Sequence, residues 1–266
     1  MSPPLFGVDF SGAKAADRAI WIAEGERVGN RVAVRRLTNA RERFGVRTGR
    51  DAHQALAALI AGSGAGALFA IDVPFALPAP LNPANWRDFV SSYAERFADA
   101  EAMRAWATAE ALRLAGAREL KRETDREAKT PFAAYNLRLY RQTDAAIRAV
   151  AAPLLGRADF PPMEPVGGGR PVVIEACPAS ALKARGLYHP YKGDPRSEVL
   201  RAARSSVLDD LAGRLDLPDA VRRAALDNPG GDALDALLCL DISARADPAQ
   251  FTPRSDVEQR EGRVYF

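Results

Sequence analysis

Three short apolar runs that each end on an acid constrain this chain most. The runs are L-F-G-V-D, ending at Asp9, L-F-A-I-D, ending at Asp72, and V-V-I-E, ending at Glu175. Continuous runs of Val, Ile, Leu and Phe are typical of strands that are buried on both faces of a parallel sheet. A fourth segment, G-G-D-A-L-D-A, opens a helix with Asp232 and Asp235. We therefore expect these carboxylates to emerge together at one edge of a sheet.

Such a gathering of acids needs compensation by protons or cations. Two carboxylates about 4 Å apart repel each other by about 4 kcal/mol at an effective dielectric near 20. Oxygen ligands at strand ends and at a helix start suit Mg²⁺ or Mn²⁺, whereas Zn²⁺ favours His and Cys. The chain has few histidines and cysteines: His53, His189, Cys177 and Cys239. The sequence therefore predicts a Mg²⁺ or Mn²⁺ site.

The order of elements predicts a mixed α/β sheet. The run at 5–10 is followed by R-A-I-W-I-A-E and R-V-A-V-R-R-L, which alternate and are separated by turn residues, so the three form consecutive antiparallel strands. A helix at 51–61 then leads to L-F-A-I-D, and a helix between strands implies a crossover to a parallel strand. We predict one domain over 1–266 with strand order 3-2-1-4-5, which places Asp9 and Asp72 on neighbouring parallel strands.

The middle of the chain has a different pattern. Between about 77 and 169 it is rich in Ala, Glu and Arg after a proline-rich bend, which predicts an all-helical insertion with helices at 86–115 and 136–152. A strand returns at 172–176. Further helices are expected at 180–185, 196–214, 218–226 and 232–245, and E-G-R-V-Y-F is a candidate last strand.

Composition favours a globular protein in a reducing compartment. Of the 266 residues, 47% are hydrophobic and 27% charged, which is ordinary for a soluble domain. No apolar run approaches the roughly 20 residues that span a bilayer, and the N-terminus lacks a charged region before an apolar one. Two distant cysteines give no disulfide framework. We expect a cytoplasmic protein that does not bind membranes.

A basic segment between Arg113 and Arg148 is a candidate nucleic-acid surface. Its Lys and Arg residues are interleaved with Phe132, Tyr135 and Tyr140, and such a surface can track a phosphate backbone and stack bases. The alternative is a solvated helical face that nearby acids partly neutralise, and the net charge of +3 does not decide between the two.

The predicted order of strands and acids resembles the RNase H-like fold, and the D-x-x-D of the late helix resembles that of RuvC-type resolvases. More closely, the chain resembles a bacterial domain-of-unknown-function family whose members are predicted nucleases of that fold. The matching segments are F-G-V-D-F-S-G-A-K, F-A-I-D-V-P-F-A-L-P, R-E-T-D-R-E-A-K-T-P-F-A-A-Y-N-L-R-L-Y-R-Q-T, I-E-A-C-P-A-S-A-L-K-A-R-G-L-Y-H-P-Y-K-G and G-G-D-A-L-D-A-L. They are spread over nearly the whole chain.

This resemblance implies a nuclease that hydrolyses phosphodiester bonds with two Mg²⁺ or Mn²⁺ ions. Asp9 would bridge the ions, with Asp72 and Glu175 on one side and Asp232 on the other, and Asp235 would be a further catalytic acid. Nucleic acid is the expected partner, and DNA and RNA are equally open.

Three basic residues are candidates for substrate binding. Lys192, in the loop H-P-Y-K-G-D-P, is placed to contact a phosphate. Lys129 and Arg138 lie in the family-like segment that follows R-E-T-D and would form a wall of the substrate site.

Each acid also has a structural alternative. Asp9 and Asp72 could hold the turns that follow their strands, Glu175 could pair with an arginine, and Asp232 could stabilise a helix start. Two other functions compete with the nuclease: a catalytically silent module that binds nucleic acid or protein, and an actin-like or sugar-kinase-like phosphotransferase. The phosphotransferase normally needs a second Gly-rich phosphate hairpin, and V-G-G-G-R-P precedes a strand instead.

Overall fold

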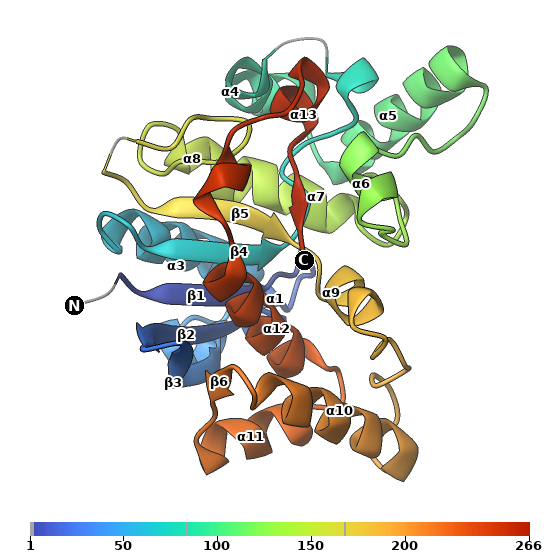
Figure 1. Ribbon diagram of the computed structural model, residues 1–266. Coiled ribbons are helices and arrows are strands. Elements are labelled where there is room, and N and C mark those ends of the chain that lie inside the picture. Colours follow the sequence, from blue (N-terminus) through green and yellow to red (C-terminus); the bar gives the residue numbers. More distant parts are fainter. Residues whose placement is uncertain (1–2, 83–84, 168) are drawn as a thin grey trace.

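A seven-stranded mixed sheet forms the centre of the protein, and helices cover both of its faces (Figure 1). The computed structural model describes residues 3–82, 85–167 and 169–266. The strands are β1 (Leu5–Asp9), β2 (Trp21–Val28), β3 (Arg31–Asn39), β4 (Leu68–Asp72), β5 (Val172–Ala176), β6 (Leu215–Asp216) and β7 (Val264–Tyr265). Their order across the sheet is β6-β3-β2-β1-β4-β5-β7.

The predicted mixed sheet is confirmed, but its strand order is longer than predicted. β1, β2 and β3 are antiparallel neighbours, and β1, β4 and β5 are parallel neighbours. The expected 3-2-1-4-5 is thus the middle of the sheet, and β6 and β7 extend it at the two edges as parallel partners of β3 and β5. β6 has only two residues, which is too short for a periodic pattern; Arg31 holds it by an ion pair to Asp216 and hydrogen bonds to nearby carbonyl oxygens.

The segment between β4 and β5 is mainly helical up to Leu154, and the single helix expected at 86–115 is instead two helices separated at 97–99. It contains α4 (Trp86–Arg96), α5 (Ala100–Ala115), α6 (Glu123–Glu127), α7 (Tyr140–Ala146), a π-helical turn (Ile147–Ala151) and α8 (Ala152–Leu154). The other helices are α1 (Ala16–Ala19), α2 (Ala40–Phe44), α3 (Gly49–Gly62), α9 (Pro178–Ala184), α10 (Glu198–Leu211), α11 (Asp219–Leu226), α12 (Asp232–Arg245) and α13 (Asp256–Glu261). The bounds of α12 are those predicted, whereas the short α1, α2, α6 and α13 were not foreseen.

The two faces of β1 bury different sets of side chains, because successive residues of a strand point to opposite faces. Phe6 and Val8 belong to the core shared with α3 and the helical insertion, and Leu5 belongs to the core shared with α10, α11 and α12. Helix α12 crosses the second face of the sheet over β1 (Figure 1). Gly7 makes that approach possible, since a Cβ there would lie 2.0 Å from the Leu240 nitrogen and 2.1 Å from the Ala236 oxygen. In the part of the chain described, no helix is long and apolar enough to cross a membrane.

Candidate metal centre

Asp9 and Asp72 lie side by side where two parallel strands end. β1 and β4 pair in a register that sets Asp9 directly beside Asp72. Asp235 joins them from the first turn of α12, the helix that Gly7 brings close to β1. One carboxylate oxygen from each of the three residues lies within 4.8 Å of the other two. The prediction that acids from distant strands and the late helix meet at one edge is therefore confirmed for these three residues.

Burial and mutual repulsion destabilise the charged forms of Asp9 and Asp72. The Asp9 side chain is 8% exposed, and burial, followed by the charge of Asp235, raises its pKa well above the usual range. The same two causes raise the pKa of Asp72 to about 7. Among the described residues, neither carboxylate has an ion-pair or hydrogen-bond partner. Two unpartnered carboxylates, of which Asp9 is buried and Asp72 partly buried, lie beside a third; this donor set fits a hard divalent cation, because all three offer oxygen.

Asp235 differs from its two neighbours because it has partners. The Tyr191 hydroxyl donates a hydrogen bond to Asp235 Oδ1 at 2.5 Å, and the Lys192 ammonium lies 2.5 Å from Oδ2. Burial opposes the charge of Lys192, but Asp235 and Asp9 raise the pKa of its ammonium, so that it stays protonated. One ammonium beside three carboxylates leaves the site with excess negative charge when all three are ionised.

The chain also matches a family model, over residues 7–257, described as a protein of unknown function (DUF429). The chain belongs to this family. No curated protein and no solved structure matches it. The resemblance to a domain-of-unknown-function family is thereby confirmed for this DUF429 chain.

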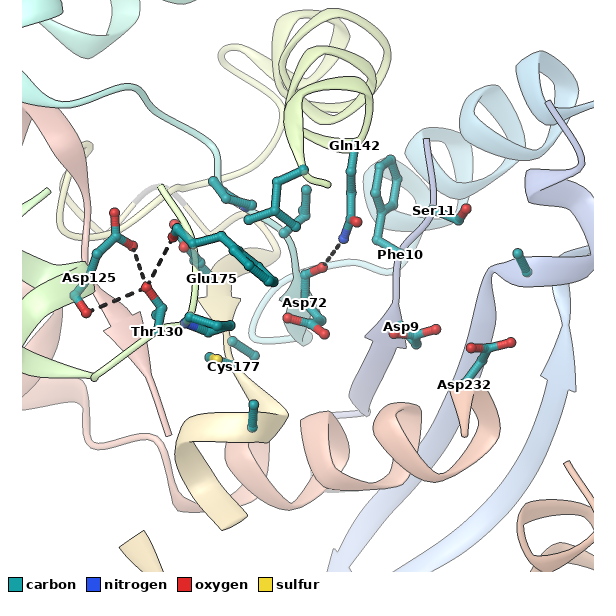
Figure 2. A pocket seen from close by; sticks show the side chains of 18 of the residues that line it. Asp9, Phe10, Ser11, Asp72, Asp125, Thr130, Gln142, Glu175, Cys177 and Asp232 are labelled. Atoms are coloured by element: carbon teal, nitrogen blue, oxygen red, sulfur yellow. Dashed lines mark hydrogen bonds between the residues drawn. The ribbon is translucent and has the colours of Figure 1, made fainter. Parts of the chain in front are cut away.

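Two residues of the triad, Asp9 and Asp72, line a pocket of about 380 Å³, and Asp235 lies outside its lining. Figure 2 shows Asp72, Asp9 and Asp232 in a row along this pocket. Asp232 lines it from the start of α12, where burial raises the pKa of its carboxyl. Its oxygens are outside the 4.8 Å cluster, which contains Asp235 instead. Asp232 is the first residue of α12 and lies one turn before Asp235, the residue that joins Asp9 and Asp72 at the strand ends.

Glu175 lines the same pocket but has a strong partner of its own. Arg122, which is 1% exposed, donates to both carboxylate oxygens of Glu175 and also binds Asp125 through two nitrogens. Burial raises the pKa of Glu175 to about 7, and Arg122 opposes that rise. The alternative that a strand-end glutamate pairs with an arginine is therefore realised, and the role of Glu175 as a metal ligand stays a prediction.

The three predicted substrate-binding residues occupy different places. Lys192 lines the pocket. Lys129 and Arg138 are exposed and are not part of the lining, but their neighbours Thr130 and Phe132 are. The Arg138 guanidinium lies 5.2 Å from the centre of the Phe132 ring.

Three residues that contact the acids were not foreseen from the sequence: Tyr191, Arg122 and Gln142. Gln142 donates to the backbone oxygen of Asp72 at 2.6 Å (Figure 2). The sequence did give a reason to consider Tyr191, because it directly precedes the candidate residue Lys192 in the same loop. The other two lie in the helical insertion, far along the chain from their partners. Cys177 also lines the pocket, but burial raises the pKa of its thiol to about 12, which disfavours the thiolate that a nucleophile needs.

Proposed function

We propose that this protein is a metal-dependent phosphodiesterase that hydrolyses nucleic acid, built on an RNase H-like fold. The observation that supports this most is the triad: two unpartnered carboxylates at the ends of adjacent parallel strands, with a third from the crossing helix. Three antiparallel strands followed by parallel ones, and a D-x-x-D at the start of α12, agree with that fold.

Asp9, Asp72 and Asp235 would hold Mg²⁺ or Mn²⁺, and Asp232, which lines the same pocket as Asp9 and Asp72, would assist with a second ion. A bound divalent ion supplies activation of a water molecule and stabilisation of charge on the phosphoryl oxygens. The protein contributes rigid placement, because Asp9 and Asp72 are fixed by strand pairing and Asp235 by the Tyr191 hydroxyl.

The walls of the pocket favour a nucleotide chain over a smaller phosphoester. Phe132, Pro131 and Leu139 give it an apolar wall, and Lys192 gives it a cation. Aromatic side chains stack on bases and ammonium groups bind phosphates, so the pocket offers contacts to both parts of a nucleotide. Lys129 and Arg138, exposed next to that wall, would bind the neighbouring backbone phosphates.

The test is cleavage of labelled single-stranded and duplex DNA, RNA and a four-way junction with Mn²⁺ or Mg²⁺ in excess. We expect metal-dependent cleavage of at least one substrate, and a loss of about 100-fold or more in Asp9→Asn and Asp72→Asn. Asp209→Asn is the matched control, because this exposed aspartate pairs only with Arg222 in the described structure. The Asp209→Asn variant should cleave at the wild-type rate.

Two outcomes would count against the proposal. Binding of nucleic acid without cleavage in either metal favours the silent module. Binding of ATP in calorimetry without nucleic acid, together with no cleavage, favours the phosphotransferase.

A further inference from the structure

The loop that carries Lys192 is fixed to the turn before α12. The Gly193 amide donates to the Pro229 oxygen at 3.0 Å. Arg204, a guanidinium only 1% exposed, donates to the Tyr191 oxygen at 2.7 Å and to the Leu226 oxygen at 2.8 Å. Because this buried arginine donates hydrogen bonds to two backbone oxygens, it holds the backbone of the loop in one place.

Gly231 leaves the space that the Tyr191 and Lys192 side chains occupy. Its φ of +80° is a conformation that favours glycine, and a Cβ there would lie 2.8 Å from Lys192 Cγ and 2.9 Å from Tyr191 Cε2. The contact between Lys192 and Asp235 is therefore built by the packing of the loop on the helix start.

The Lys192 side chain is partly exposed, although the carboxylate that it contacts is buried. The side chain is 48% exposed, whereas Asp235 is 3% exposed. Its long stem can rotate toward the open part of the pocket without moving the loop, because the anchors described above act on the backbone.

We propose that Lys192 is a tethered cation that occupies one carboxylate oxygen of Asp235 until a divalent ion displaces it. The inference rests on the proposed function only in that the triad takes a divalent ion. The ammonium and the ion compete for Asp235 Oδ2, so the lysine weakens the binding of metal alone.

Displacement also gives the lysine its second partner. The released ammonium remains in the pocket, where a phosphodiester anion can bind it. An anion that draws Lys192 away from Asp235 favours metal binding, and metal binding frees Lys192 for the anion; this coupling is reciprocal. Lys192 would thus be a positioning residue that makes the full metal site form in the presence of substrate.

The test is the affinity for Mn²⁺ alone, measured by calorimetry at pH 7.5 on the full chain without nucleic acid. We expect Lys192→Met to bind Mn²⁺ about tenfold more tightly than wild type, since it removes a charge-assisted contact that the ion must break. Lys192→Arg keeps the charge and should stay near the wild-type affinity. Lys14→Met, which removes an exposed lysine in the turn after β1, is the control for general charge and should change little.

Circular dichroism on each variant shows that it is folded, and Lys192→Gln replaces Lys192→Met if the latter does not fold. An affinity in Lys192→Met equal to or weaker than wild type overturns the competition and leaves the proposed function standing. If wild type and all variants fail to bind Mn²⁺, both the competition and the proposed function fall.

Discussion

Replacing Asp9 by Asn should stabilise the metal-free protein at alkaline pH, although it changes a buried residue in the centre of the site. Asp9 has no hydrogen-bond or ion-pair partner among the described residues, so the amide loses no contact. Like charges separated by the 4.8 Å that bounds the triad repel by about 3.5 kcal/mol per pair at an effective dielectric near 20.

The net effect is smaller than the sum of two such repulsions. Attraction to Lys192 offsets about one of them, and uptake of a proton relieves part of the rest. We therefore expect Asp9→Asn to raise the free energy of unfolding by about 2 kcal/mol at pH 8 in EDTA. The gain should be smaller at pH 5, because the raised pKa of Asp9 favours its neutral form as the pH falls.

Asp241→Asn is the matched control from the same helix as Asp235. Asp241 is equally buried, but Arg185, Arg214 and Arg245 all bind its carboxylate. Burial opposes ionisation, yet these arginines lower the pKa of Asp241. Removing its charge leaves the guanidinium groups short of a partner, so this variant should lose about 2 kcal/mol or more at pH 8.

Urea is the denaturant of choice because it is uncharged and does not screen the repulsion that is measured. Unfolding is followed by circular dichroism at pH 5 and pH 8 in EDTA. A loss of more than about 1 kcal/mol in Asp9→Asn at pH 8, or an equal gain at both pH values, would refute the electrostatic argument and indicate a structural role for Asp9.

Two further predictions concern the pH dependence of wild type and the approach of α12. Because the pKa of Asp72 rises from 3.8 to about 7 on folding, the folded protein holds more protons in this range, and the stability of metal-free protein should fall by about 2 kcal/mol between pH 5 and pH 8. Saturating Mn²⁺ should remove that fall, and a rise of stability with pH in EDTA would contradict it. Gly7→Ala places a Cβ against the backbone of α12 and should cost about 3 kcal/mol, whereas Gly62→Ala has open space and should change little; equal unfolding midpoints in urea would contradict this.

The sequence predicted best what depends on local periodicity. The apolar runs gave β1, β4 and β5, and their parallel order followed from the helix between the first two, so the pairing of Asp9 with Asp72 could be foreseen. The sequence pattern of α12 predicted where this helix begins and ends. β6 could not be foreseen, because two residues carry no period and their place depends on Arg31.

The site itself was predicted less completely, because the side chains that contact its acids come from distant segments of the chain. Arg122 lies 53 positions before Glu175, and no local pattern specifies that a guanidinium from the insertion reaches a strand end. The sequence placed Asp232 and Asp235 at the start of one helix, but only the packing of α12 on β1 selects Asp235 for the triad.

Arg122 has a consequence for any attempt to exchange parts of this protein. It joins α6 to β5 through Asp125 and Glu175, and it also donates to the Glu261 oxygen near the end of the chain. Without it, two buried acids would face each other unpaired. The insertion is therefore not an interchangeable module: a chimera that received it from another member of the family would need the arginine and Asp125 from the insertion and a matching glutamate in the host strand β5.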